Sequence, residues 1–148
     1  MHVALGADHA GFQLKDALKE ALDDLGATYQ DFGTNGPDPV DYPDVAGAVA
    51  AGVGAGQFDR GILVCGSGVG MAIAANKTSG VRAAPIANPD SARLAREHND
   101  LNVLALGARS TPLADARDIV RVFLQTPFAG GRHERRVQKI RQLESSSH

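Results

Sequence analysis

The residues whose types could do chemistry lie closest together in a glycine-rich stretch, residues 61–77. This stretch holds Cys65, the only cysteine of the chain, and Ser67 two positions later. Three glycines surround the serine: Gly66, Gly68 and Gly70. Glycines let the backbone turn tightly and bring its N–H groups close to a ligand. A thiolate can act as a general base. Cys65 is therefore the first candidate for a catalytic residue.

The segments on either side predict how this cysteine is presented. Residues 62–64 form an apolar run typical of a buried strand, and the Ala-rich residues 71–76 are typical of a buried helix. The partial positive charge of a helix N-terminus favours a nearby anion such as a thiolate. The alternative is that Cys65 only packs in the core. The spacing Gly66-x-Gly68-x-Gly70 is neither the dinucleotide-binding pattern nor a P-loop.

Further polar residues follow two other predicted segments. Asp8 and His9 come after the apolar residues 2–5, and Asp41 and Tyr42 end a long loop rich in turn residues. If the strands are parallel, these turns meet Cys65 at the carboxyl edge of one sheet. An acid, an imidazole and a thiol at that edge could open a sugar ring and move a proton between adjacent carbons. The alternative makes Asp8 a helix cap and His9 an ordinary turn residue.

Two groups of residues lie outside this edge. His98 and Asn99 end a predicted helix, at the opposite edge of the sheet, so a catalytic His98 would most simply serve a neighbouring subunit. Locally, they would be a cation and a cap at a helix C-terminus. Arg132 and Arg136 are four residues apart on one helix face, which would suit a phosphate monoester, with Arg109 as a third donor. A solvated basic helix face is the alternative.

The elements that position these residues alternate along the chain. Strands are expected near residues 2–5, 27–32, 62–64, 81–87 and 103–108. Helices are expected near residues 14–25, 45–53, 71–76, 88–98, 111–125 and from 130. Asn88-Pro89 and Thr111-Pro112 are helix-starting pairs. This order predicts an α/β fold, with helices on both faces of a five-stranded parallel sheet. The last helix has no strand after it, so it either packs on a second subunit or lies in solvent.

Length, charge and composition restrict the class of protein. The 148 residues fit a single domain, expected over residues 1–143, with a disordered tail at residues 144–148. A formal net charge of −2 argues against a nucleic-acid partner. A lone cysteine excludes an internal disulfide and suits a reducing compartment. No apolar run approaches the roughly 20 residues of a membrane span. A cytoplasmic protein is therefore expected.

Six short motifs together resemble the type B ribose-5-phosphate isomerases and their galactose-6-phosphate isomerase relatives. The resemblance spans about residues 1–143. The motifs are Gly-Ala-Asp8-His9-Ala-Gly-Phe, Asp41-Tyr42-Pro43, Cys65-Gly-Ser67-Gly-Val-Gly, Ala-Asn76-Lys77, His98-Asn99-Asp100 and Gly-Gly-Arg132-His133. It implies a Rossmann-like three-layer α/β/α sandwich, no metal or organic cofactor, and a homodimer or homotetramer with sites shared between subunits.

The resemblance also implies a role for each site residue. Cys65 would remove the C2 proton of a sugar phosphate, and His98 would help to open the furanose ring. Asp8, also expected to be catalytic, would contact the sugar. Ser67, which is threonine in many members, would move protons between the substrate oxygens. Some members use a glutamate as the base at the position of Met71, which cannot take a proton. The implied substrate contacts are Asp8, His9, Tyr42, Gly66, Ser67, Gly68, Val69, Gly70 and Asn99, and the implied phosphate contacts are His9, Arg109, Arg132 and Arg136.

The resulting hypothesis is interconversion of ribose 5-phosphate and ribulose 5-phosphate through a cis-enediolate, with Cys65 as the base. Two alternatives stay open. One is isomerisation of another aldose phosphate, such as galactose 6-phosphate, allose 6-phosphate or a tetrose phosphate. The other is a non-catalytic domain that binds a sugar phosphate, for which the glycine-rich turn and the arginines alone would suffice.

Overall fold

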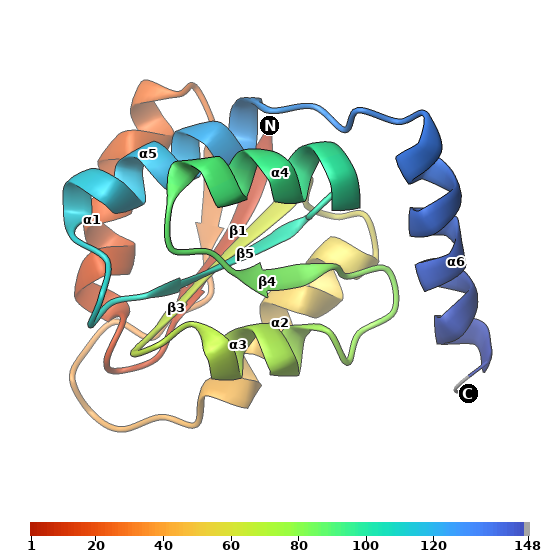
Figure 1. Ribbon diagram of the computed structural model, residues 1–148. Coiled ribbons are helices and arrows are strands. Elements are labelled where there is room, and N and C mark those ends of the chain that lie inside the picture. Colours follow the sequence, from red (N-terminus) through yellow and green to blue (C-terminus); the bar gives the residue numbers. More distant parts are fainter. Residues whose placement is uncertain (147–148) are drawn as a thin grey trace.

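Five parallel strands form the centre of the computed structural model, which describes residues 1–146 (Figure 1). The strands are β1 (His2–Ala7), β2 (Thr28–Asp31), β3 (Arg60–Cys65), β4 (Ala83–Pro85) and β5 (Val103–Gly107). Their order across the sheet is β2-β1-β3-β5-β4. From β1 the chain adds β2 on one side, and it then crosses to the other side, where β3 pairs with β1 and β5 lies between β3 and the edge strand β4. Ligands of such sheets bind at the carboxyl ends of the strands beside this change of direction.

Helices cover both faces of the sheet, which confirms the predicted three layers (Figure 1). The six helices are α1 (Phe12–Asp24), α2 (Tyr42–Gly54), α3 (Val69–Ala75), α4 (Pro89–Asn99), α5 (Leu113–Gln125) and α6 (Arg132–Ser146). α1, α4 and α5 pack on one face, and α2 and α3 pack on the other. No helix within residues 1–146 is both long and apolar enough to cross a membrane.

The central strand β3 shows why the sheet needs both helical layers. Ile62 and Val64 belong to the core under α1, α4 and α5, whereas Leu63 and Cys65 belong to the core under α2 and α3. Side chains along a strand point alternately to its two faces. A continuous apolar run therefore fills two cores at once, as the sequence predicted for residues 62–64.

The helix boundaries confirm one predicted cap and correct two others. Asn88 caps α4, because its Oδ1 accepts a hydrogen bond from the Ser91 N–H at 2.8 Å. The expectation that Thr111 begins the next helix was wrong: Thr111 is buried and Pro112 occupies the N-cap position of α5. The C-cap of α4 is Asp100, in the left-handed conformation with φ +50°, rather than Asn99, which is still helical.

The C-terminal helix α6 stands apart from the two helical layers (Figure 1). Val137 is buried, and the Gly80 N–H donates to Glu144 Oε1 at 3.0 Å, so the helix touches the body of the chain near its middle and near its C-terminal end. The helix continues to Ser146, which corrects the tail expected from residue 144. Residues 147–148 of that tail lie outside the described residues.

Candidate active site

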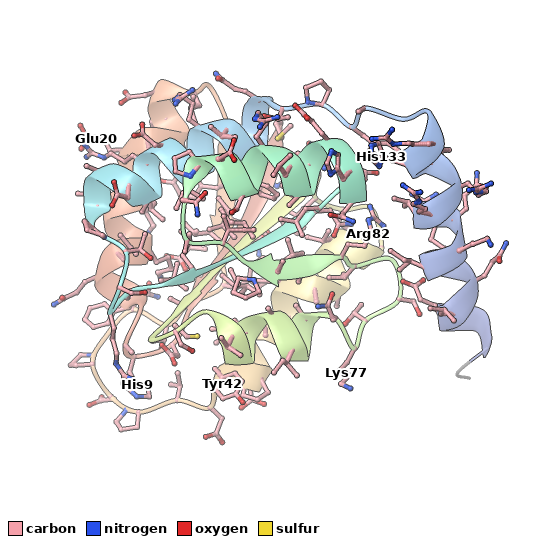
Figure 2. The ribbon with its side chains drawn as sticks, in the orientation of Figure 1. His9, Glu20, Tyr42, Lys77, Arg82 and His133 are labelled. Carbon is pink, nitrogen blue, oxygen red and sulfur yellow. The ribbon has the colours of Figure 1, made fainter. Side chains whose placement is uncertain are left out.

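A cavity of about 430 Å³ lies at the carboxyl ends of β1, β3 and β5. It brings together most of the predicted residues. Those that line it are Asp8, His9, Tyr42, Cys65, Gly66, Ser67, Val69, Gly70 and Arg109, together with Ala10 and Ile73. His9 and Tyr42 are seen side by side at the lower end of the molecule in Figure 2. The prediction that these residues meet at one edge of the sheet is therefore confirmed.

Cys65 ends β3 with its side chain at the wall of this cavity, although only 5% of the residue is exposed. The Gly68 N–H donates a hydrogen bond to its sulfur at 3.1 Å. Gly68 makes this turn with φ +80°, a conformation that side chains disfavour. A donor aimed at the sulfur stabilises negative charge on it. The turn thus suits a thiolate.

Two other glycines let large side chains reach the turn. A Cβ atom on Gly66 would lie 3.0 Å from Cζ of Arg109, so the guanidinium rests directly on the Gly66 backbone. A Cβ atom on Gly70 would lie 2.6 Å from Cε1 of Tyr42, so the phenol ring covers Gly70. The cavity therefore has a cation and an aromatic ring close to the turn that follows the thiol.

Asp8 serves the local backbone as well as the cavity. Its Oδ1 accepts hydrogen bonds from the Ala10 N–H at 2.9 Å and the Gly11 N–H at 3.1 Å, which fixes the turn that leads into α1. The helix-cap alternative for Asp8 was wrong, because the N-cap residue of α1 is Gly11 and no side chain caps this helix. Asp8 instead stabilises the turn before the helix and also lines the cavity. Only 7% of Asp8 is exposed.

His9 is exposed, and its ring is oriented by a loop from elsewhere in the chain. The Val40 N–H donates to His9 Nδ1 at 3.2 Å. Because Nδ1 accepts this bond, the proton of the neutral ring sits on Nε2, which is free to act as a donor to a ligand. This tautomer follows from the hydrogen-bond geometry.

The mouth of the cavity combines one hydroxyl with an apolar rim. Ser67 is exposed, and its Oγ accepts a hydrogen bond from the Val69 N–H at 3.3 Å. Tyr42, Val69 and Ile73 are 41%, 48% and 59% exposed. Ile73 was not among the predicted site residues, because its position on α3 resembles that of any helical apolar residue. Exposed apolar side chains gathered at one opening indicate a surface that another molecule covers.

Five predicted residues do not line this cavity. One is Gly68, whose backbone N–H instead donates to the sulfur of Cys65. His98 and Asn99 end α4, and Arg132 and Arg136 lie on α6. Figure 2 shows His133, the neighbour of Arg132, at the other end of the molecule from His9 and Tyr42. Asn99 lines a second cavity, of about 440 Å³, between α3, α4, β4 and α6. The prediction that His98 lies away from Cys65 within one subunit is confirmed.

His98 and His133 form a stacked pair with ring centroids 4.3 Å apart and an interplanar angle of 14°. Desolvation lowers the pKa of His133, and the nearby charges of His98, Arg132 and Arg136 lower it further. No role was predicted for His133 from the sequence. Its position beside Arg132 after two glycines was the available signal. The pair and the arginines form a second polar group, separate from the cavity.

The side chains at the cavity were also compared with what a metal ion requires. Within residues 1–146 there is no cluster of three or more histidine, cysteine, aspartate or glutamate side chains placed to hold a metal ion. The side chains at the cavity instead offer a thiol, a carboxylate, an imidazole, a hydroxyl and a guanidinium.

Comparison with known proteins supports a common architecture and a common chemistry. Residues 3–140 match the family model described as Ribose/Galactose Isomerase. The chain is 46% identical over 142 residues to ribose-5-phosphate isomerase B of Escherichia coli, covering 96% of this chain and 95% of that protein.

Two solved structures extend this likeness to three dimensions. The ribose-5-phosphate isomerase B of Clostridium thermocellum has a TM-score of 0.97 and 47% identity, with 100% of both chains covered. The ribose-5-phosphate isomerase B of Mycoplasma genitalium, solved with bound ribulose-5-phosphate, has a TM-score of 0.93 and 40% identity. That match covers 97% of this chain and 96% of the Mycoplasma chain.

Proposed function

The chain belongs to the ribose/galactose isomerase family, and from this premise we propose that it interconverts ribose 5-phosphate and ribulose 5-phosphate. One observation carries the proposal: Cys65 lines a cavity with Asp8 and His9, and its sulfur accepts the Gly68 N–H. The cavity thus offers a base where a sugar phosphate would bind, and a similar structure holds ribulose-5-phosphate.

The central step is a proton transfer between two adjacent carbons. The thiolate of Cys65 takes the proton from C2 of the open-chain aldose, which leaves an enediolate. The resulting thiol returns a proton to C1, while Ser67 moves a proton from the C2 hydroxyl oxygen to O1. The C2 oxygen becomes the ketone, and no electrons leave the substrate. This sequence regenerates the thiolate and needs neither a metal nor an organic cofactor.

The glycine-rich turn stabilises the enediolate in this proposal. The backbone N–H groups of residues 66–70 would donate to the oxygen on which charge develops. In the free chain the Gly68 and Val69 N–H groups donate to Cys65 and Ser67, so these two would have to be shared with the substrate. Removing one such donor from other oxyanion sites costs about 3 kcal/mol in the barrier. Tyr42 and Val69 border the same opening and would contact the sugar.

Ring opening and phosphate binding involve both polar groups. Asp8 in the cavity, with His98, would open the furanose ring. His9 and Arg109 line the cavity and would hold the phosphate. Arg132 and Arg136 are exposed, are one turn apart on α6, and would complete the phosphate site. Asn99 beside His98 would contact the substrate.

We therefore also propose a homodimer or homotetramer in which one subunit supplies the cavity and another supplies His98, Asn99, Arg132 and Arg136. Two features support this. The apolar rim formed by Tyr42, Val69 and Ile73 is exposed in the single chain. The α6 helix stands apart and exposes 67% of Leu143. The cytoplasmic location stays a prediction from the cysteine content.

Activity measurements distinguish the proposal from its rivals. Cys65→Ala and Cys65→Ser should lose nearly all isomerase activity yet bind ribose 5-phosphate, because the thiol is the base and not a main contact. Exchange of the C2 proton with deuterated solvent should occur in the wild type and vanish in both variants. A non-catalytic binder would show no exchange, and near-normal turnover by either variant would refute the assignment of Cys65. Comparing pentose, tetrose and hexose phosphates tests which aldose fits.

A further inference from the structure

Lys15 on α1 is a fully buried lysine, with 0% of its surface exposed. A buried ammonium group is costly unless it is paired and hydrogen-bonded. Its Nζ lies 2.8 Å and 2.7 Å from the two carboxylate oxygens of Asp31, and 2.8 Å from Oδ1 of Asn35. Its three hydrogen-bond partners therefore come from one neighbouring segment, which begins at the end of β2, and Asp16 Oδ1 on α1 itself lies 3.4 Å from the same Nζ.

That segment continues into the loop formed by residues 32–41, and Lys15 binds the residues at its start. Asp31 Oδ1 also accepts the Gly33 N–H at 2.7 Å, and Asp31 Oδ2 lies 2.8 Å from Nζ of Lys19. The Ala7 N–H donates to the Gly33 carbonyl at 2.7 Å, so the loop is also tied to the end of β1. The first residues of the loop thus have fixed positions relative to α1 and the turn after β1.

The other end of the same loop reaches the active-site cavity. The Val40 N–H donates to Nδ1 of His9 at 3.2 Å. Two residues later, Tyr42 begins α2 and covers Gly70. The start of the loop is therefore bound to the buried Lys15, and its end contacts or leads into two residues that line the cavity, His9 and Tyr42.

We propose that Lys15, acting through Asn35, is a positioning residue that holds the loop of residues 32–41 so that Val40 orients the His9 imidazole toward the substrate. This inference rests on the proposed function, in which His9 contacts the sugar phosphate. Lys15 touches no substrate in this arrangement. A buried ion pair adds little net stability compared with apolar residues of similar volume, but it can specify one arrangement of the segments that it joins.

The test changes Asn35 rather than Lys15, because removing a buried charge partner can unfold the protein. Asn35→Leu removes the acceptor on the loop but leaves the pair of Lys15 with Asp31 intact. Asn35→Asp keeps an acceptor for Lys15 and is the conservative variant. Lys19→Met is the matched control, since Lys19 also binds Asp31 but has no hydrogen bond to the loop beyond it.

One measurement tests whether Asn35 holds the loop, and a second tests whether the loop affects substrate binding. Hydrogen exchange of the Val40 amide, followed by NMR, should accelerate roughly tenfold in Asn35→Leu and stay near the wild-type rate in the other two variants. For the isomerase reaction, KM for ribose 5-phosphate should rise about tenfold in Asn35→Leu with kcat within about twofold, because binding geometry is lost but the base is not. Asn35→Asp should restore KM.

The two readouts separate failure of this inference from failure of the proposed function. Val40 exchange and KM that are unchanged in a folded Asn35→Leu protein would overturn the role of Lys15 and Asn35, even with wild-type turnover intact. If the wild type does not isomerise ribose 5-phosphate, the amide exchange still tests the link from Asn35 to His9. Equal acceleration in Lys19→Met would also overturn the inference, since the loop would then respond to any loss at Asp31.

Discussion

The backbone N–H of Gly68 points at the sulfur of Cys65 across 3.1 Å. Gly68 reaches this position with φ +80°, and a Cβ atom there would lie 3.1 Å from the Leu106 carbonyl carbon. The hydrogen bond therefore depends on a residue without a side chain. The glycine-rich motif around Cys65 therefore does two things: it forms a tight turn, and it places a backbone N–H donor against the thiol.

Gly68→Ala should reduce turnover more than stability. The left-handed conformation costs a non-glycine residue about 1–2 kcal/mol, and the crowded Cβ should shift the N–H away from the sulfur. We expect kcat to fall by about tenfold or more, measured with ribose 5-phosphate. Gly26→Ala is the matched control, because Gly26 has φ +72° with no atom near its Cβ position. It should lose similar stability in urea unfolding and keep its activity. Equal kcat values in the two variants would contradict the role of the Gly68 donor.

Gly70→Ala should weaken substrate binding through Tyr42. The new Cβ would lie 2.6 Å from Cε1 of the ring, so the phenol must move away from the cavity. We expect KM to rise by roughly tenfold, as misplaced contact groups raise it elsewhere. The control is Gly47→Ala on α2, the helix that Tyr42 begins, where a Cβ meets nothing within 4 Å. That change should stabilise the protein by up to about 1 kcal/mol without altering KM. An unchanged KM in Gly70→Ala would show that the ring position does not matter.

The sequence predicted the sheet and the cavity because their signals are local. The run of residues 62–64 fills two cores, and Asn88 caps the helix that follows it, so both could be recognised within a few residues. Parallel strand order then brings Asp8, Tyr42 and Cys65 to one edge. The same logic placed His98 at the other edge. These conclusions need only periodicity, caps and topology.

The missed features depend on contacts between distant segments. Lys15 lies on the buried face of α1, although lysine is a residue type that is usually exposed, and its partner Asn35 is 20 residues away. The stacking of His98 on His133 joins residues 35 positions apart in two helices. Thr111 looked like a helix cap but is buried, and Pro112 takes that position. Tertiary packing, which no short window contains, decided each case.

Asp31→Asn should destabilise the protein at neutral pH and much less in acid. Burial raises the pKa of Asp31, but hydrogen bonds from Lys15, Lys19 and the Gly33 N–H together lower it below its usual range. A carboxyl whose pKa is lower in the folded state adds stability above its unfolded pKa of about 4, and this stability is lost as the pH falls through the folded value. We expect a loss of about 2 kcal/mol at pH 7 in urea unfolding. The gap to the wild type should narrow below about pH 4.

The control for this experiment is Asp118→Asn. Asp118 is exposed and lies 3.8 Å from Arg121, so its loss should change the free energy of unfolding by less than about 1 kcal/mol. A gap between wild type and Asp31→Asn that stays constant from pH 7 into acid would show that the carboxylate charge is not what stabilises the loop.

Mixed assemblies should reveal whether two subunits share each site. A chain with Cys65→Ala and a chain with His98→Ala are each expected to be inactive as the sole subunit. If His98 serves the cavity of its partner, one site in each mixed dimer joins an intact Cys65 with an intact His98. Random assembly makes half of the dimers mixed, so co-expression should recover about a quarter of wild-type kcat. The matched control pairs Cys65→Ala with Asp8→Ala, two residues that line the same cavity of one chain. Every site is then damaged and no activity should return. Two outcomes would contradict the shared site. One is recovery of activity in the control mixture. The other is no recovery of activity in the mixture with His98→Ala although mass spectrometry shows that mixed dimers have formed.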